Sequence, residues 1–514
     1  MHLPLILELA SETMAERIVV EEISCSELSL LARRTASLIA SRSMDSQAIS
    51  TLVFCDTNSA AFPVALFGSA LAGIPFTPVN YRLADDALRA LVSRTAPSLV
   101  IAGDGVAERL GQVPGVEVIS RQEFLAMIND FGHDRIHDGQ AAERISSVDV
   151  DPSAPAVLLF TSGTSGEPKA AVLRHEHLAS YILSTVELAS SAEGDAALVS
   201  VPPYHIAGVS AVLSNTYAGR RIVYLAGFTP EAWVDSVVNH GVTHAMVVPT
   251  MLHRVLDELS RRNETLPNLR HLSYGGGPMP LPVVERAMDM LPHVDFVNAY
   301  GLTETSSSIA VLGPDDHRAA RASTDPVRRR RLGSVGQPLP VVEISIRDEH
   351  GQEVAPGERG LIWVRGPQVS GQYRESSPGQ PVLDDDGWFN TRDAGELDSD
   401  GYLFVFGRQD DVIVRGGENL SPGEIEDVLI RHPAVSEAVV VGIPDIDWGE
   451  KVVAAVVLHP ESVVSESEVQ DFVRAALRSA RTPEHIQFRT SLPATETGKI
   501  LRRTIRAELS DLWD

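Results

Sequence analysis

Apolar residues up to Asn298 follow two alternating patterns, short continuous runs and longer segments with helical spacing. Short continuous runs are typical of strands that are buried on both faces of a parallel sheet. We expect such strands at Ser98–Ala102, Ala197–Val201, Arg221–Leu225, Thr243–Val248, Arg270–Ser273 and Val294–Asn298. We expect helices at Ala61–Gly73, Ala84–Arg94, Pro230–His240, Thr250–Arg262 and Leu281–Met290. This alternation predicts an α/β fold built from layers of helices and largely parallel sheets.

The pattern changes in residues 313–332, which mix acidic residues with the basic run Arg328–Arg331 and show no clear period. We expect a mobile surface loop here. Its basic run is interpreted as a solvated charge cluster in preference to an anchor for a phosphorylated partner. Strand-like alternation returns at Val341–Arg347 and Gly360–Val364, which predicts a smaller β unit.

The predicted elements become shorter beyond Gly407. Ser421-Pro422-Gly423-Glu424 has the residues of a helix start, with Ser at the N-cap, Pro at the first helical position and Glu at the third. A second capping box at Ser465–Glu468 predicts a helix that ends near Ala480. Strands are expected at Val435–Val441 and Lys451–Leu458. Together these elements predict a compact α+β domain of about 100 residues, with its boundary at Arg408–Asp411.

Composition narrows the class of protein. A chain of 514 residues is too long for one hydrophobic core, so two or more domains are expected. With 69 acidic and 43 basic residues, the net charge of −26 argues against nucleic acid or an anionic membrane as the main partner. Cys25 and Cys55 provide no disulfide framework, which favours a reducing cytoplasm. No apolar run is long enough to span a bilayer, and Met1–Ala10 lacks the basic start of a signal peptide.

The most informative stretch lies directly after the apolar run Pro155–Leu159. Residues 160–169 read Phe-Thr-Ser-Gly-Thr-Ser-Gly-Glu-Pro-Lys, so a predicted strand runs into glycines, hydroxyls and one lysine. Glycines let backbone N–H groups converge on an anion, and the hydroxyls and the ammonium add donors, so the loop suits phosphate. It differs from the P-loop of kinases and GTPases, because two residues separate Gly166 from Lys169 and Ala170 follows. Taken alone, the segment is also compatible with a Gly/Ser surface turn.

Three later segments add to this signal. Residues 300–304 read Tyr-Gly-Leu-Thr-Glu, residues 415–424 read Arg-Gly-Gly-Glu-Asn-Leu-Ser-Pro-Gly-Glu, and residues 497–503 read Thr-Gly-Lys-Ile-Leu-Arg-Arg. In this order and spacing, the four segments closely resemble the adenylate-forming superfamily, which contains acyl-CoA synthetases, luciferases and the adenylation domains of peptide synthetases. The resemblance covers nearly the whole chain.

The resemblance implies a large N-terminal adenylation domain over residues 1–409, a small mobile C-terminal domain over 410–514 and a hinge at Asp410. It also implies an ATP-dependent acyl-CoA synthetase with Mg²⁺ as cofactor. A carboxylate and ATP would give acyl-AMP and pyrophosphate, and the thiol of CoA would then take the acyl group and release AMP. Because the carboxylate and the phosphates are anionic, the site needs Mg²⁺, a lysine and many N–H donors.

The resemblance also assigns the residues that would contact the phosphates and the metal. The β- and γ-phosphates would contact the first loop, through Thr161, Ser162, Gly163, Thr164, Ser165, Gly166 and Lys169. Thr303 would hydrogen-bond the α-phosphate. Glu304, together with Thr161, would bind Mg²⁺ through hard oxygen ligands. A solvated surface acid is the alternative interpretation of Glu304.

The nucleoside would lie against a second group of residues. Its members are Gly275, Gly276, Tyr300, Gly301, Asp393 and Arg408. The ring of Tyr300 would stack on adenine, and Asp393 would accept both ribose hydroxyls, with Arg408 reaching the ribose as well. The alternatives are that Tyr300 is a core aromatic residue and that Asp393 is a turn residue.

The C-terminal segments would act in turn. Lys499 resembles the family lysine that reaches the α-phosphate and the carboxylate oxygen during adenylation. Rotation of the C-terminal domain would then remove Lys499 and bring Gly416, Gly417 and Glu418 to the acyl adenylate, where glycines let a pantetheine thiol approach closely.

The acyl pocket would be lined by Tyr204, His205, Ala207, Gly208, Ser210, Gly277, Ser306 and Ser308. An aromatic residue at the position of His205 gates the CoA tunnel in the family, so we count His205 with the catalytic candidates; a packed core histidine is the alternative. Small side chains leave volume, which predicts a bulky acid, and the serines make an oxygenated acid plausible. The alternative is that these glycines serve only the backbone turn.

Other functions remain open at this point. An adenylating enzyme could pass its acyl-AMP to a carrier protein, which we expect to be a separate chain, or to a partner enzyme. A non-catalytic nucleotide-binding relative is disfavoured, because Glu304, Asp393 and Lys499 are all present. Nothing in the sequence favours a luciferase-like oxygenase.

Overall fold

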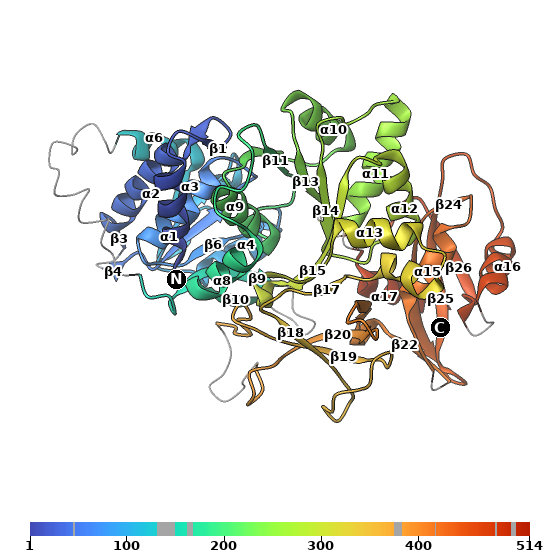
Figure 1. Ribbon diagram of the computed structural model, residues 1–514. Coiled ribbons are helices and arrows are strands. Elements are labelled where there is room, and N and C mark those ends of the chain that lie inside the picture. Colours follow the sequence, from blue (N-terminus) through green and yellow to red (C-terminus); the bar gives the residue numbers. More distant parts are fainter. Residues whose placement is uncertain are drawn as a thin grey trace.

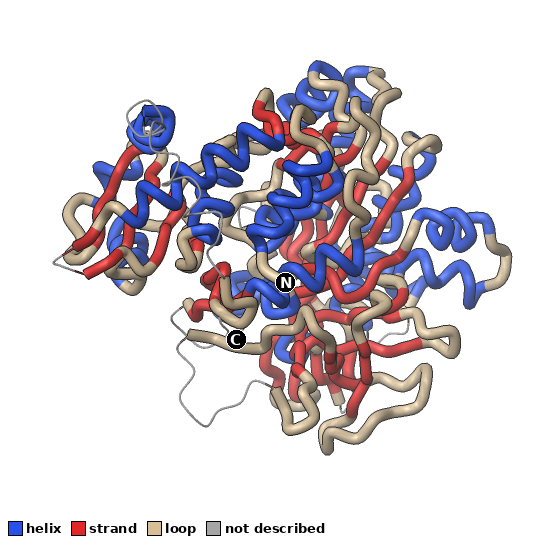
Figure 2. Tube along the Cα trace, turned by 60° about the vertical axis from the view of Figure 1, so that its left-hand side comes forward, coloured by secondary structure: helices blue, strands red, loops and turns tan. Residues whose placement is uncertain are grey.

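The computed structural model describes residues 1–44, 47–130, 150–161, 168–374, 383–416, 418–477, 481–494 and 500–513. These residues form four larger β-sheets with helices packed around them (Figures 1 and 2). The predicted α/β fold, with layered sheets, a smaller β unit and a small α+β C-terminal part, is confirmed. Most observed elements begin and end within a few residues of the predicted ones.

The first sheet has a hydrophobic core on each face. It contains β5 (Thr51–Cys55), β6 (Phe76–Pro78), β7 (Ser98–Ala102), β8 (Val116–Ser120), β9 (Pro155–Thr161) and β10 (Lys169–Arg174), in the spatial order β10-β9-β6-β5-β7-β8. Neighbouring strands are parallel except β10, which returns antiparallel to β9. Successive residues of a strand point to opposite faces, so Phe54 packs into one core and Val53 into the other.

Two layers of helices cover this sheet. One layer contains α1 (Leu3–Thr13), α2 (Cys25–Ala40), α3 (Ala61–Leu71) and α6 (Arg121–Asp130), and the other contains α4 (Asp85–Ser93) and α5 (Val106–Leu110). In the first layer, the ring of Phe62 meets the rings of Phe54 and Phe76 edge to face, with both pairs of centroids 5.2 Å apart. These aromatic contacts hold α3 against the centre of the sheet.

The second sheet carries the parallel strands of the middle of the chain. It contains β1 (Ile18–Val20), β2 (Ile23–Ser24), β11 (Ala196–Val199), β12 (Arg221–Tyr224), β13 (His244–Val247), β14 (His271–Gly275), β15 (Asp295–Leu302), β16 (Ser307–Leu312) and β17 (Gln337–Pro338), in the order β17-β16-β15-β14-β13-β11-β12-β1-β2. One face shares the first core through α8 (His175–Thr185) and α9 (Ile206–Ala218). The other face packs, around the fully buried Trp233, against α10 (Pro230–Asn239), α11 (Pro249–Arg262) and α12 (Leu281–Met290).

The smaller β unit is an antiparallel sheet of consecutive strands. It contains β18 (Glu343–Arg347), β19 (Gly360–Arg365), β20 (Phe389–Leu397) and β21 (Leu403–Arg408). Its apolar side packs on β16 of the second sheet through Ile309 and Ala310. The unit therefore places Asp393, in the middle of β20, and Arg408, at the end of β21, beside Tyr300 of β15.

The C-terminal part has hydrophobic clusters of its own on the two faces of its sheet. After η3 (Gln409–Asp411) it contains β22 (Ile413–Arg415), β23 (Glu418–Leu420), α15 (Pro422–Ile430), β24 (Val435–Asp445), β25 (Gly449–Leu458), α16 (Glu466–Ala476), β26 (His485–Arg489) and α17 (Arg502–Trp513). Both clusters contain only residues from Ile413 onward. A separate core is the property that makes a segment an independent domain, and it supports our proposed boundary at residues 409 and 410.

The prediction of a mobile loop at residues 313–332 is wrong. The segment forms α13 (Pro314–Ala322), α14 (Pro326–Arg330) and η2 (Arg331–Gly333). Three arginines of the basic run are paired within the protein: Arg329 with Glu285 at 2.8 Å, Arg330 with Glu396 at 2.6 Å and Arg331 with Asp398 at 2.8 Å. Because the acidic partners come from distant parts of the chain, the pairing is invisible in the local sequence.

The two predicted helix starts have different outcomes. At Ser465 the capping box forms, because its hydroxyl accepts from the N–H of Glu468 at 3.3 Å and the Glu468 carboxylate accepts from the N–H of Ser465 at 2.8 Å. The helix ends at Ala476, earlier than predicted. At Ser421 no side-chain cap forms, since the hydroxyl donates to the carbonyl of Phe406 at 3.3 Å, on β21. Tertiary contact with the β unit replaces the local cap.

Among the described residues, every helix is too short or too polar to cross a membrane. The thiols of Cys25 and Cys55 are both free and buried. Burial raises the pKa of Cys25 to about 11 and that of Cys55 to about 12, so both thiols stay protonated and unreactive near neutral pH.

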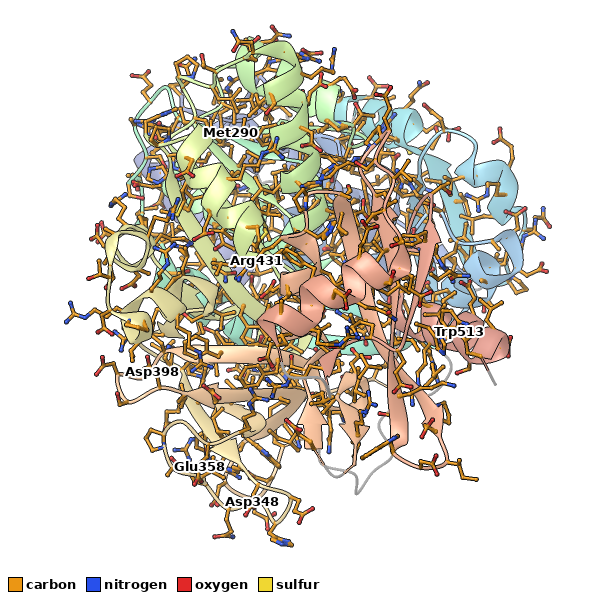
Figure 3. All side chains as sticks on the ribbon, turned by 90° about the vertical axis from the view of Figure 1, so that its right-hand side faces the viewer. Met290, Asp348, Glu358, Asp398, Arg431 and Trp513 are labelled. Atoms are coloured by element: carbon orange, nitrogen blue, oxygen red, sulfur yellow. The ribbon has the colours of Figure 1, made fainter. Side chains whose placement is uncertain are left out.

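The carboxylate of Asp427 forms a hydrogen bond across the border between the C-terminal part and the rest of the chain. Helix α15 of the C-terminal part lies against α12 of the second sheet; Figure 3 labels Arg431, just after α15, and Met290, the last residue of α12. Asp427 of α15 accepts the backbone N–H of Leu281, the first residue of α12, which has no side-chain cap of its own. Burial, with the nearby Glu426 carboxylate, raises the pKa of Asp427 to about 7, although Arg431 opposes this shift.

We predict that Asp427→Asn stabilises the protein in a pH-dependent way. Asp427 has a folded pKa near 7 and an unfolded pKa near 3.8, so the folded chain holds a proton that the unfolded chain has released, and stability falls as pH rises through this interval. Asparagine still accepts the Leu281 N–H but carries no charge. By calorimetry, the Tm of the variant should exceed that of the wild type by roughly 2–6 °C at pH 8.5 and match it near pH 4. An equal difference at both pH values would contradict the explanation.

Candidate active site

The predicted nucleotide residues gather at the carboxyl ends of parallel strands, where open α/β sheets bind ligands. Gly275 ends β14, Tyr300 and Gly301 lie near the end of β15, and Thr161 ends β9. The loop that follows Thr161, with Ser162, Gly163, Thr164, Ser165 and Gly166, lies outside the described residues, as do Gly417 and Lys499. The contacts predicted for these residues stay predictions.

Asp393 is held by two partners, one on each carboxylate oxygen. The hydroxyl of Tyr300 donates to Oδ2 at 2.6 Å, and Nε of Arg408 lies 3.0 Å from Oδ1. Asp393 is only 6% exposed and sits opposite Arg408 in the β20–β21 ladder. Burial and the adjacent carboxylate raise the pKa of Tyr300 well above its usual value, so the hydroxyl remains a donor. The arrangement orients a carboxylate, the kind of group that can accept the two hydroxyls of a ribose.

Thr391 completes the support for this carboxylate. Its hydroxyl donates to the carbonyl of Ile362 at 2.8 Å and accepts the N–H of Asp393 at 3.1 Å, and its carbonyl accepts Nη1 of Arg408 at 2.7 Å. The interpretation of Asp393 as a plain turn residue is wrong, because it lies within β20. Tyr300 does pack against the apolar side of the β unit, while its hydroxyl serves Asp393. Stacking of its ring on adenine stays a prediction.

Glu304 faces a tyrosine that the sequence analysis did not identify. The hydroxyl of Tyr373 donates to Oε1 of Glu304, which is 8% exposed, so the interpretation of Glu304 as a solvated surface acid is wrong. Nζ of Lys169 lies 5.8 Å from the centroid of the Tyr373 ring. Burial and the Glu304 carboxylate raise the pKa of Tyr373 above its usual value, so it also remains a donor. The predicted phosphate lysine and the predicted metal ligand therefore meet at one side chain.

Two sets of contacts lie at the base of the predicted phosphate loop. Lys169 is paired with Thr161 in the β9–β10 ladder, and the Thr161 hydroxyl donates to the Lys169 carbonyl at 3.3 Å. Arg94, at the end of α4, donates to the carbonyl of Pro168 at 2.8 Å and lies 5.1 Å from the ring centroid of Phe160. The sequence analysis did not identify Arg94, because the residues around it form no motif and lie far from the loop in the sequence.

The segment after Gly301 forms a tight turn. Thr303 and Glu304 lie in η1 (Thr303–Thr305), and Ser306 and Ser307 then adopt positive φ angles of 58° and 130°. A Cβ on Gly301 would lie 1.9 Å from the carbonyl oxygen of Ser307, so only glycine permits this approach. The turn thereby directs Glu304 into the site.

Part of the predicted acyl pocket is brought together by α9. The hydroxyls of Ser210, on α9, and Ser307 lie 3.3 Å apart, which joins the helix to the turn. Ser306 is fully buried, and its hydroxyl has no hydrogen-bond partner among the described residues. Tyr204, Ala207 and Gly208 are buried or half-buried near the start of α9. Gly277 is half-buried in the loop after β14, and Ser308 is half-buried in β16. His205 is exposed at the N-cap of α9, so the interpretation as a packed core histidine is wrong.

Of the predicted thiol-approach residues, Gly416 directly follows β22 and Glu418 is the first residue of β23. Gly416 has a φ of 56°, and its N–H donates to the carbonyl of Trp448 at 2.8 Å. Glu418 is exposed and lies 3.2 Å from Nη2 of Arg481. The backbone of Asp410 lies in η3, between the last strand of the β unit and the first strand of the C-terminal part. This position is compatible with the hinge that we predict there.

The residues present suit Mg²⁺ held by one carboxylate together with substrate phosphates. Within the described ranges, no three side chains of His, Cys, Asp or Glu cluster as a metal site. Mg²⁺ is commonly held by one or two carboxylates together with substrate phosphates. Glu304 could supply such a carboxylate, because none of the hydrogen bonds among the described residues engages its Oε2. The role of Thr161 as a second ligand stays a prediction.

We predict that Asp393→Asn weakens binding of the ribose. Loss of charge-assisted hydrogen bonds costs about 1.5–3 kcal/mol, so the Kd for ATP should rise ~10- to 100-fold by calorimetry. The preference of the wild type for ATP over 2′-deoxyATP should shrink in the variant. Asp348→Asn, in the turn after β18, is the control (Figure 3) and should leave both values unchanged. Unchanged discrimination in Asp393→Asn would remove the ribose assignment.

Comparison with known proteins agrees with this geometry. Residues 10–374 match the family described as AMP-binding enzyme, and residues 424–499 match the AMP-binding enzyme C-terminal domain. Relatives include a fatty acid–[acyl-carrier-protein] ligase of Streptomyces coeruleorubidus, 33% identical over 86% of this chain and 83% of the relative. A 2-succinylbenzoate–CoA ligase of Bacillus licheniformis is 36% identical over 70% and 71%. A feruloyl-CoA synthase of an Amycolatopsis species is 30% identical over 88% of each chain.

Solved structures show the same relationship. The O-succinylbenzoate coenzyme A synthetase of Bacillus subtilis, in complex with ATP and magnesium ion, superposes with a TM-score of 0.79 at 29% identity, over 97% of this chain and 98% of that one. The resemblance that the four sequence segments indicated is confirmed over nearly the whole length. The chain belongs to the AMP-binding enzyme family of the adenylate-forming superfamily and is an ATP-dependent ligase of the AMP-forming kind.

Proposed function

We propose that the protein is an acid–CoA ligase that activates a bulky, oxygen-bearing carboxylic acid. The observation that carries this proposal is the meeting of two predicted groups of residues in one site. The Asp393 carboxylate accepts from Tyr300, and Glu304, four residues after Tyr300, accepts from Tyr373, whose ring faces Lys169. A ribose clamp and a phosphate and metal clamp that are linked through one short stretch of chain suit a single ATP molecule.

The first half-reaction would form an acyl adenylate. A carboxylate oxygen of the acid attacks the α-phosphorus of ATP, the bond from that phosphorus to the bridging oxygen breaks, and pyrophosphate leaves with the electron pair. Asp393 and Arg408 would hold the ribose, and Thr303 would donate to the α-phosphate. Lys169 would neutralise the leaving pyrophosphate, since fixed charges at developing negative charge lower the barrier. Mg²⁺ bound at Glu304 would neutralise further phosphate charge.

The second half-reaction would transfer the acyl group to a thiol. The sulfur attacks the acyl carbon, and AMP leaves from it. We propose that residues 410–514 rotate about Asp410 between the two steps, so that Gly416 and its neighbours replace Lys499 at the site. The separate hydrophobic clusters of this part and the polar contacts at its border support the proposal. Domains joined by a small polar interface move relative to each other more easily than domains joined by a large apolar one.

CoA is the acceptor that we propose, and a carrier protein is the alternative. Two of the relatives named above are CoA ligases or synthases, and one is an acyl-carrier-protein ligase. Acyl transfer to CoA and to a phosphopantetheine-bearing carrier, measured side by side, distinguishes the two. We also propose a cytoplasmic location, which the two buried free cysteines support.

The chemistry of the acid follows from the turn after Glu304. Ser210 and Ser307 place two hydroxyls in contact, and the buried hydroxyl of Ser306 lies in the same turn. A buried hydroxyl without a partner costs free energy, which an oxygen atom of a ligand would recover. No lysine or arginine is among the predicted pocket residues, which favours a neutral hydroxyl, ether or ketone on the acid over a second carboxylate. The relative named for ferulate, an aromatic acid with hydroxyl and ether oxygens, supports an oxygen-bearing aromatic acid.

We predict that oxygen-bearing aromatic acids are better substrates than small or purely aliphatic ones. Pyrophosphate release should be measured for acetate, octanoate, benzoate, a hydroxycinnamate and a polycyclic acid, each with and without CoA. The kcat/KM should be highest for an oxygenated ring acid, and Ser307→Ala should lower that value ~10-fold while leaving benzoate unchanged. A clear preference for acetate would end the pocket assignment without affecting the adenylation assignment.

We predict that Lys499→Ala separates the two half-reactions. The residue should contact charge only during adenylation, so acid-dependent exchange of pyrophosphate into ATP should fall ~10²-fold or more. Formation of acyl-CoA from supplied acyl-AMP should keep its wild-type rate. Equal losses in both reactions would contradict domain rotation.

A further inference from the structure

Residues 368–374 connect the turn after Glu304 to the hairpin that bears the phosphate loop, and we call them the bridging segment. At one end, Nε2 of the buried Gln368 donates to the carbonyls of Thr305 at 2.9 Å and Ser308 at 2.7 Å. The N–H of Ser370 then donates to the carbonyl of Glu304 at 2.9 Å. The bridging segment therefore holds the backbone of the turn at three carbonyl groups.

The other end of the bridging segment lies along β10. The N–H of Val172 donates to the carbonyl of Gln372 at 2.9 Å, and the N–H of Arg374 donates to the carbonyl of Ala170 at 2.9 Å. Ala171 forms an antiparallel bridge with Tyr373. The segment thus adds to the free edge of the first sheet, only two residues beyond Lys169.

Tyr373 stands where these two connections meet. Its hydroxyl donates to Oε1 of Glu304, and its ring faces Nζ of Lys169 at 5.8 Å from the centroid. A cation over a tyrosine ring is attracted by roughly 0.5–2 kcal/mol. The Tyr373 side chain therefore contacts both the carboxylate of Glu304 and the ammonium of Lys169. It keeps these two charged groups apart, whereas a direct ion pair would bring them together.

The surroundings of Tyr373 argue against a role in packing alone. The side chain is half-buried and belongs to none of the hydrophobic clusters formed by the described residues. A tyrosine that only fills space would be expected among apolar neighbours. Its hydroxyl occupies one oxygen of Glu304, and the hydrogen bonds of the described residues leave Oε2 unengaged.

We propose that Tyr373 is a positioning residue for the adenylation step, which rests on the function proposed above. Its hydroxyl fixes the rotation of the Glu304 carboxylate so that Oε2 is directed at the phosphate-bound cation. Its ring keeps Lys169 from collapsing onto that carboxylate and holds the ammonium ready for the pyrophosphate oxygens. Because the bridging segment is bonded both to β10 and to the turn after Glu304, the positions of Lys169 and Glu304 are coupled.

The test compares Tyr373→Phe, which removes only the hydroxyl, with Tyr373→Leu, which also removes the ring. Tyr402→Phe is the matched control, since the Tyr402 hydroxyl likewise donates to a carboxylate, that of Asp316 at 2.7 Å. Three properties are measured: Tm, the Kd for ATP by calorimetry with and without Mg²⁺, and the rates of the two half-reactions with acid and with supplied acyl-AMP.

In Tyr373→Phe we expect an unchanged Tm and an unchanged Kd for ATP without Mg²⁺. The gain in ATP affinity on adding Mg²⁺ should shrink at least 5-fold, and the Mg²⁺ concentration for half-maximal pyrophosphate exchange should rise by a similar factor. Thiolation of supplied acyl-AMP should stay at the wild-type rate. Tyr373→Leu should in addition weaken ATP binding without Mg²⁺, because Lys169 loses its support.

Two results would overturn the proposal. One is a wild-type response to Mg²⁺ in Tyr373→Phe, and the other is an equal loss in both half-reactions with a lowered Tm, which indicates a purely structural role. If the wild type itself exchanges pyrophosphate with none of the acids, the proposed function fails. The binding measurements with Mg²⁺ and ATP still decide the role of Tyr373 in that case.

Discussion

Two buried carboxylates, each held by a tyrosine hydroxyl, are the interactions on which the candidate site depends. Asp393 accepts from Tyr300, and Glu304 accepts from Tyr373. Each carboxylate is less than a tenth exposed, so it has lost most of its hydration and needs a donor. A tyrosine orients the carboxylate without neutralising it, and the raised pKa of both tyrosines keeps the donated proton in place. The oxygens of both carboxylates therefore stay acceptors, which suits the ribose hydroxyls and the cation that we propose to bind there.

These two pairs join three sheets. Tyr300 lies near the end of β15 in the second sheet, Glu304 lies in η1 directly after that strand, and Asp393 comes from the β unit. Tyr373 lies on the edge of the first sheet, through its bridge to Ala171. The site therefore exists only where the three sheets are docked, and small shifts between them change the directions of both carboxylates. Such dependence on several packed elements is typical of sites that must hold charged groups within a fraction of an ångström.

The border of the C-terminal part differs in character from these junctions. Two of its contacts are hydrogen bonds. The Asp427 carboxylate accepts the backbone N–H of Leu281, and the Ser421 hydroxyl donates to the carbonyl of Phe406. Both groups can be satisfied by water once the parts separate, so breaking the contacts costs little. The two clusters of the C-terminal part contain only its own apolar residues. This division between internal apolar packing and a polar border suits the rotation that we propose.

Much of the fold was determined by the sequence itself. The runs at Ser98–Ala102 and Leu281–Met290 were predicted with the observed bounds, because burial on both faces and helical spacing leave direct traces in the order of residues. The capping box at Ser465 was also readable, since all of its atoms lie within four residues. The residues of the candidate site could be proposed from the sequence because their motifs are local.

The tertiary structure decided what depends on residues far apart in the chain. The arginines of α14 and η2 look like a solvated run, but Glu285, Glu396 and Asp398 pair with them. Ser421 has the sequence of a cap, yet its hydroxyl contacts Phe406 instead. Tyr373 and Arg94 carry no motif, and they became visible only when folding placed one beside Glu304 and the other beside Pro168. A local sequence pattern reflects the contacts that a residue makes with its neighbours along the chain. The contacts named here arise from the docking of sheets, and the local pattern does not specify which sheet edges meet.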